Sequence, residues 1–151
     1  MHRLAYSVLL VAAILICAAK EETLDELKTR FESARVDDRP ELGIRIARQQ
    51  LRNADQLYGN GRIEQARAAV DDIVSYSEKA RDAATESKKR LKNVEIDVRK
   101  IADKLRDIKR TLAFDDQAPV DQAIRRLEDV RTTLLQAMFA KEKKDKKEQK
   151  K

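Results

Sequence analysis

Residues 62–113 have the sequence RIEQARAAVDDIVSYSEKARDAATESKKRLKNVEIDVRKIADKLRDIKRTLA, and this stretch decides the fold. It contains no glycine or proline, and small or apolar residues recur at alternating spacings of three and four along its whole length. That spacing places one continuous stripe on a helix, formed by Ala66, Val70, Ile73, Ser77, Ala80, Ala84, Ser87, Leu91, Val94, Val98, Ile101, Leu105, Ile108 and Leu112. The stretch therefore predicts a single long helix, about 75 Å if continuous.

The centre of this stripe is weak. Ser77, Ala80, Ala84 and Ser87 are small or polar, whereas the positions on either side are mostly Val, Ile and Leu. The helix is therefore expected to be weakly buried, closely packed or bent in this segment.

Two shorter helices are expected before the long one. Thr23-Leu24-Asp25-Glu26 fits a capping box and predicts a helix over residues 24–36. Pro40 suits a first helical turn and begins a second helix over residues 40–58, which Gly59-Asn60-Gly61 ends. The short turn makes this helix antiparallel to the next.

The composition agrees with an all-α protein. The chain has 151 residues, 40% of them charged and 4% aromatic, with only 3 Gly and 2 Pro. A sheet-rich fold needs many more turn-forming residues than this, whereas Ala, Leu, Lys, Arg and Glu favour helices.

After the long helix, residues 114–119 are expected to form a loop, with Pro119 opening a fourth helix that ends near residue 140. The second and fourth helices would together cover most of the long helix. This predicts an elongated rod of antiparallel helical hairpins that share one long helix over residues 62–113. The alternative is a compact four-helix bundle, with the long helix broken near Thr85 to Lys89.

The first nineteen residues have the features of a signal peptide. Arg3 precedes an apolar run from Leu4 to Ile16, and small residues end at Ala19, after which cleavage is expected. The alternatives are an uncleaved membrane anchor and a lipoprotein modified at Cys17. The helical domain then spans residues 20–140, and the Lys-rich tail spans residues 141–151.

Cleavage would also remove the only cysteine and the only histidine, Cys17 and His2. The chain from Lys20 would then offer neither a thiolate nor an imidazole for metal binding or nucleophilic catalysis. We therefore expect no catalytic residue, no metal and no cofactor, and a protein that is not an enzyme.

Basic charge is concentrated in two segments. Lys79 to Arg110 holds 12 basic and 6 acidic residues, and the tail holds 7 lysines against 3 acidic residues with no apolar position, so the tail is expected to be frayed or disordered. An anionic lipid or cell-wall polymer is a candidate partner, whereas nucleic acid is disfavoured by export and by the lack of interleaved aromatic residues. The candidate binding residues are Lys88, Lys89, Arg90, Lys92, Lys143, Lys144, Lys146 and Lys147.

A two-helix layer buries little apolar surface, so a protein partner or self-association through helices is expected. The candidate contact residues lie on the second half of the long helix and near the end of the fourth helix. They are Leu91, Val94, Ile96, Val98, Ile101, Leu105 and Phe139.

Small, large and glycine positions around the Gly61 turn form a pattern shared with a known repeat. Ala54, Leu57, Gly61, Ile63, Ala66 and Val70 carry it, and the segment over about residues 44–80 resembles a single tetratricopeptide helical hairpin. The resemblance implies two antiparallel helices packed through small residues. A single unit cannot form a solenoid with a peptide-binding groove.

Together these features favour a non-enzymatic exported helical protein that acts as a scaffold, spacer or protein-interaction module in the cell envelope. The alternatives are an anionic lipid or envelope polymer binding protein and a periplasmic holdase. The small size, basic balance and export signal are similar to those of the envelope chaperones of the Skp/OmpH type.

Overall fold

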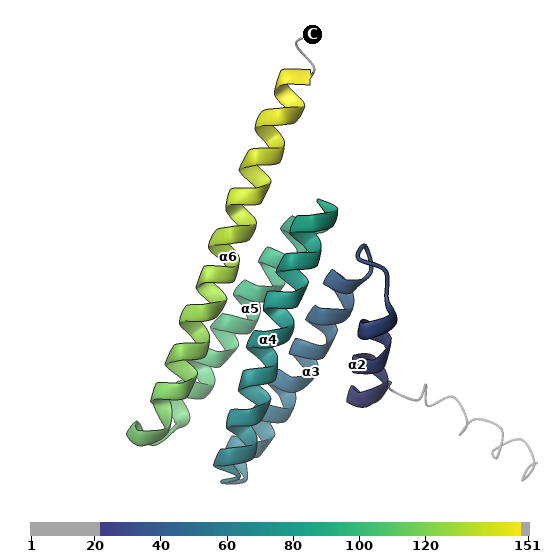
Figure 1. Cartoon of the computed structure of the whole chain (residues 1–151). Helices are drawn as coiled ribbons and strands as arrows, with labels where there is room; N and C mark the ends of the chain where they lie inside the picture. The colour runs from purple at the N-terminus through teal and green to yellow at the C-terminus, as the bar shows by residue number, and fades with distance from the viewer. Residues whose placement is uncertain (1–21, 149–151) are drawn as a thin grey trace, which may run out of the picture.

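The computed structural model describes residues 22–148, and this part of the chain is all-α. Its five helices are α2 (Leu24–Ser33), α3 (Arg39–Gly59), α4 (Ile63–Ser87), α5 (Leu91–Thr111) and α6 (Phe114–Glu148) (Figure 1). The all-α class predicted from the composition is confirmed. The predicted signal peptide lies outside the described residues, as do His2 and Cys17.

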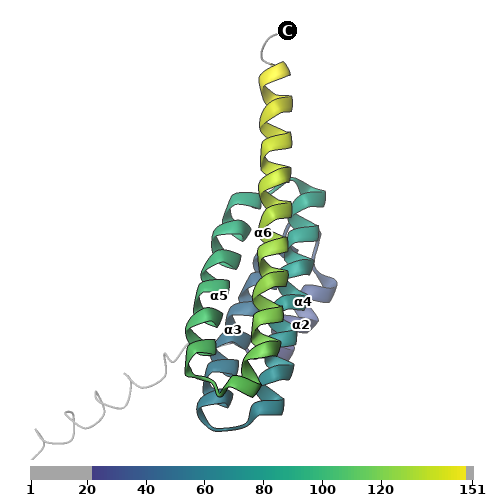
Figure 2. The same cartoon turned by 90° about the vertical axis from the view of Figure 1, so that its left-hand side faces the viewer.

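The helices form a compact four-helix bundle with α2 on its outside (Figures 1 and 2). One antiparallel hairpin consists of α3 and α4, and the other consists of α5 and α6. The hairpins pack face to face, with α4 against α6 and α3 against α5, while α2 packs on α3. This is the arrangement given above as the alternative to a rod.

A single hydrophobic core runs through both hairpins. It contains most of the stripe positions predicted from the sequence, and Ser77, Ala80 and Ala84 at the centre of the stripe are buried, whereas Ser87 is half-buried. Ser77 is fully buried, and its hydroxyl is satisfied there because it donates to the Ile73 carbonyl oxygen at 2.7 Å. The largest fully buried side chains are Ile46, Ile73, Ile101, Leu105, Leu127 and Leu134.

The prediction of one continuous helix over residues 62–113, and of a rod built on it, is wrong. The chain leaves the helix between Ser87 and Leu91, where Lys88 and Arg90 have φ angles of 56° and 59°. The break turns α5 back along α4. A straight helix would bury one stripe under a thin layer, whereas the folded arrangement places the apolar faces of four helices in one core.

Other helix boundaries also differ from the expected ones. The first helix ends at Ser33 instead of residue 36, and the second spans Arg39–Gly59. Residues 114–119 are not a loop but the start of α6, with Pro119 inside the helix. Pro119 is tolerated near this end because it removes only one backbone hydrogen bond from a long helix.

The predicted disorder of the tail is also wrong for residues 141–148, which continue α6 to Glu148. Lysine and glutamate are good helix formers, and they extend a helix that the bundle has already nucleated. Side chains at 141–146 are exposed because this part of α6 passes beyond the end of the bundle (Figure 2).

The short helix α2 is fixed by its cap and by an aromatic pair. Thr23 and Glu26 form the predicted capping box. Phe31 packs edge-to-face on Tyr76 of α4 with a ring-centroid distance of 5.4 Å, and the Lys79 ammonium lies 4.7 Å from the Tyr76 centroid.

None of the helices in the described part of the chain combines the length and the apolar character that crossing a membrane requires.

Candidate functional site

The most distinctive surface lies where α6 leaves the bundle beside the α4–α5 junction (Figures 1 and 2). Junction residues Lys88, Lys89, Arg90 and Lys92 are all exposed there, and so are the lysines of the projecting helix. We call this surface the basic end and define it by these four residues together with Lys141, Lys143, Lys144 and Lys146. The break in the predicted long helix is what brings the two sequence-predicted basic segments together.

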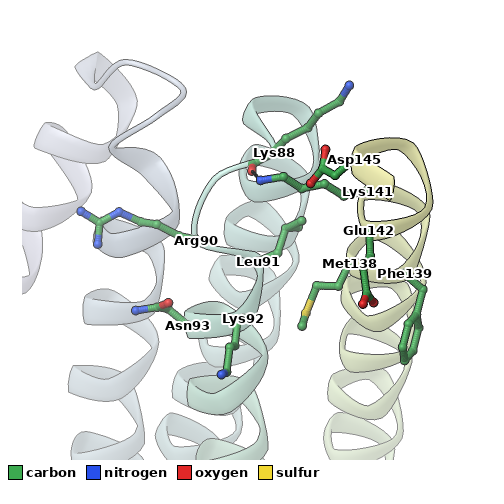
Figure 3. Close-up of a pocket in the computed structure, with 10 residues that line it drawn as sticks. All are labelled: Lys88, Arg90, Leu91, Lys92, Asn93, Met138, Phe139, Lys141, Glu142 and Asp145. Atoms are coloured by element: carbon green, nitrogen blue, oxygen red, sulfur yellow. Dashed lines mark hydrogen bonds between the residues drawn. The ribbon is translucent and has the colours of Figure 1, made fainter. Parts of the chain in front are cut away.

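One hydrogen bond joins the two halves of the basic end. The Lys141 ammonium donates to the Lys88 carbonyl oxygen at 3.3 Å (Figure 3). Lys88 ends α4 in the left-handed conformation, so its carbonyl is free of the regular helical pattern. Lys141 was not among the candidates chosen from the sequence, because only the break at residue 88 gives it this partner.

Two of the junction cations are paired with carboxylates near the start of α3. Lys89 contacts Asp37 at 2.5 Å, and Arg90 contacts Glu41 at 2.9 Å. The hydrogen bond from Lys89 lowers the pKa of Asp37 below its ordinary value. These contacts place the junction against α3 and partly neutralise its charge.

The remaining cations are less neutralised. Within the described part of the chain, Lys88, Lys92, Lys143 and Lys144 form no ion pair with a carboxylate, and Lys146 contacts Glu142 at 3.1 Å. Lys147 lies in the last turn of α6. Together with Lys141, whose hydrogen-bond partner is a backbone carbonyl oxygen, five ammonium groups without a carboxylate partner among the described residues thus remain at one end of the molecule.

Charge is divided between two sides of the projecting helix. The core-facing row of α6, with Leu134 buried and Met138 half-buried, continues at spacings of four and seven from Met138 as Glu142 and Asp145. These two carboxylates and Met138 line an open groove of about 410 Å³ with Lys88 and Lys92 of the junction (Figure 3).

The adjacent side of the projecting helix is basic and carries an aromatic ring, which also borders this groove. Phe139 points away from α4 and α5 (Figure 3), and 61% of its surface is exposed. Lys143 and Lys146 follow at spacings of four and seven, which places them on the same side as Phe139. The projecting helix therefore presents one exposed aromatic ring in line with two lysines.

Most candidate partner contacts serve the chain's own fold. Leu91, Val94, Val98, Ile101 and Leu105 are buried in the bundle core, so they are not available to a second chain in this arrangement. Ile96 is half-buried, and Phe139 alone of this group is exposed. The five buried residues were expected in a thin two-helix layer, but α5 folds back and places them in the core instead.

Phe114 is an exposed residue that sequence reasoning missed. It is the first residue of α6, with 86% of its surface exposed at the end of the bundle opposite the basic end (Figure 1). The exposure of this side chain could not be predicted, because residues 114–119 were expected to form a loop. A residue at the very start of a helix also has no preceding turn whose periodicity would show which way it faces.

A second titratable cluster joins α5 to α6 away from the basic end. Arg131 donates to Glu95 at 2.9 Å and to Glu128 at 2.8 Å, and Arg106 donates to Glu128 at 2.5 Å. Burial alone would raise the pKa of Glu128, but the two arginines outweigh it and hold the pKa below its ordinary value. Each carboxylate in this cluster has an arginine partner, so the cluster holds the hairpin together.

No group of three or more His, Cys, Asp or Glu side chains suited to hold a metal ion occurs among residues 22–146. The segment resembling a tetratricopeptide hairpin forms the end of α3 and the start of α4, with Ala54, Ala66 and Val70 buried between the helices.

No protein-family model, curated protein or solved structure matches the chain.

Proposed function

We propose that this protein is a non-enzymatic interaction module of the cell envelope that docks on an anionic surface through its basic end. The bundle holds the projecting part of α6 in a fixed position, and this part of the helix binds the surface. The observation that carries the proposal is the arrangement of Phe139, Lys143 and Lys146 on one side of a helix that extends beyond the bundle.

The energetics suit reversible docking. A lysine near an anionic surface contributes about 1 kcal/mol of attraction, so the basic-end lysines that have no carboxylate partner supply a few kcal/mol. Insertion of the exposed Phe139 ring would add a hydrophobic contribution of about 1.5–3 kcal/mol. The electrostatic part is screened over about 8 Å at physiological salt, so binding should weaken as salt rises.

The predicted export supports an envelope location for this surface. Beyond the cell interior, lipid headgroups and charged wall polymers are the abundant polyanions, and nucleic acid is not. A scaffold or spacer role follows from the same geometry, because a docked α6 would hold the bundle at a fixed distance from the surface.

The holdase alternative has less support. Large apolar side chains that are exposed in the described part of the chain are Phe114 and Phe139, which lie near opposite ends of the bundle. Isolated exposed residues are ordinary on soluble proteins, whereas binding of unfolded chains needs a contiguous apolar patch.

Vesicle flotation tests the proposal. The chain from Lys20 onward contains the whole described core, and we expect it to float with vesicles of phosphatidylglycerol and phosphatidylcholine in equal parts at about 0.15 M salt. Lys143→Glu/Lys144→Glu should lower the partition coefficient at least about tenfold.

Arg99→Glu/Lys100→Glu is the matched control, because it changes the net charge equally on exposed residues in the middle of α5. We expect at most about a threefold effect from it, since these residues lie away from the basic end. Equal losses in the two variants would show that net charge, and not the basic end, drives binding, and would contradict the proposal.

A further inference from the structure

The break between α4 and α5 is formed by residues that disfavour it. Lys88 and Arg90 both adopt the left-handed conformation, which side chains other than Gly, Asn and Asp rarely occupy. Lys and Arg are also among the better helix formers. The local sequence at residues 88–90 therefore favours a helix, and only the tertiary fold holds it open.

The apolar register continues across the break without a shift. Ala84, Ser87, Leu91 and Val94 keep the spacings of three, four and three residues that the flanking helices follow. If residues 88–90 became helical, α4 and α5 would form one helix from Ile63 to Thr111, with both buried stripes on the same side.

The contacts that hold the junction in place are few and exposed. They are the ion pairs Lys89–Asp37 and Arg90–Glu41, the hydrogen bond from Lys141 to the Lys88 carbonyl oxygen, and a local hydrogen bond from the Lys89 N–H to Ser87 Oγ. Exposed pairs of this kind contribute little to stability. The junction is therefore held mainly by the packing of one hairpin on the other.

The interface between the hairpins is extensive and complementary. It contains the apolar contacts of α4 with α6 and of α3 with α5. Charge pairs lie along it, including Glu78–Arg126 at 2.8 Å and Arg67–Asp116 at 3.0 Å. An α5–α6 hairpin from a second copy would make these same contacts.

We propose that residues 88–90 are a hinge through which two copies of this chain exchange α5–α6 hairpins. In the resulting dimer, α4 and α5 of each copy form one continuous helix, and each α3–α4 hairpin packs on the partner's α5–α6 hairpin. The exchange keeps the inter-hairpin core and relieves two left-handed residues in each chain. It does not depend on docking to an anionic surface.

Cross-linking between two single-cysteine variants of the chain tests the exchange. A chain from Lys20 carrying Glu78→Cys is mixed with one carrying Arg126→Cys, and both are unfolded and refolded together at high concentration. Neither chain has another cysteine, because Cys17 is absent. A short bis-maleimide should then link position 78 of one chain to position 126 of the other, but only in the dimer fraction.

The control replaces Arg126→Cys with Arg99→Cys. Arg99 is exposed on α5 and, unlike Arg126, forms no ion pair with Glu78, so this variant should give no such link. A chain that stays monomeric at every concentration would overturn the proposal. So would a dimer in which positions 78 and 126 of different chains are not linked.

Glycine substitution at the hinge gives a second, independent measurement. Lys88→Gly/Arg90→Gly removes the left-handed penalty in the monomer and weakens the straight helix in the dimer. We expect the dissociation constant of the dimer to rise at least about tenfold by light scattering.

Asp82→Gly/Arg99→Gly is the matched control. Both residues are exposed and lie inside helices in either form, so the two forms should be weakened alike and the dissociation constant should change by less than about threefold. No effect of the hinge glycines, or an equal effect in the control, would contradict a hinge at residues 88–90.

Discussion

At Gly43 the backbone of α3 comes unusually close to α4. A methyl group at this position would lie 2.9 Å from the Tyr76 carbonyl oxygen, 3.0 Å from Ala80 Cβ and 3.3 Å from Phe31 Cε2. We therefore predict that Gly43→Ala lowers the free energy of unfolding by about 1–3 kcal/mol in urea denaturation.

Gly59→Ala is the matched control, because no atom lies within 4 Å of its added methyl group. It should leave stability unchanged or raise it by up to about 1 kcal/mol, since alanine favours the helix. A Gly43→Ala variant as stable as the wild type would show that α3 and α4 are not in this close contact.

The Glu95, Glu128 and Arg131 cluster predicts how stability depends on pH. Because the folded-state pKa of Glu128 is lowered, its contribution is present above the ordinary glutamate pKa and is lost as pH falls through the lower, folded-state pKa. The free energy of unfolding should therefore fall on acidification below about pH 4.3. Glu128→Gln should fall less steeply over the same range, and parallel curves for the two proteins would contradict this assignment.

At the scale of elements, the projecting part of α6 should contribute nothing to the fold. Side chains at 141–146 are exposed, and among the described residues the one hydrogen bond that they form with the bundle is that from Lys141 to the Lys88 carbonyl oxygen. A chain ending at Ala140 should keep its free energy of unfolding within about 0.5 kcal/mol, while its helical circular dichroism signal falls. A larger loss of stability would show that this segment packs on the bundle.

The helix ends and turns that could be predicted from the sequence are those that depend on neighbouring residues. Thr23 and Glu26 predicted the capping box correctly, and Gly59-Asn60-Gly61 predicted the turn between α3 and α4, because caps and turns depend on neighbouring residues. The break at residues 88–90 carried no such signal, since Lys88 and Arg90 favour a helix and the heptad register continues past them. Burial of four helices in one core overrides that local preference.

At the scale of the molecule, the same break determines which parts of the candidate site could be foreseen. The basic residues of 88–92 and of the tail were recognisable from charge alone. Their meeting at one end was not, because it requires α5 to fold back and α6 to return past residue 88. The buried role of Leu91 and Leu105 was hidden for the same reason.

The whole molecule therefore has two unlike ends. The exposed Phe139 lies at the basic end, and the exposed Phe114 lies at the start of the same helix, about 37 Å away along its axis. Because the chain has no tryptophan, Phe139→Trp and Phe114→Trp each place a single fluorescent reporter at one end.

Tryptophan emission with anionic vesicles tests the docking proposal most directly. On adding phosphatidylglycerol vesicles to the chain from Lys20, the Phe139→Trp emission should shift to shorter wavelength and be quenched by brominated lipids, while the Phe114→Trp emission stays unchanged. An unshifted signal at position 139, or an equal shift at both positions, would contradict docking through the basic end.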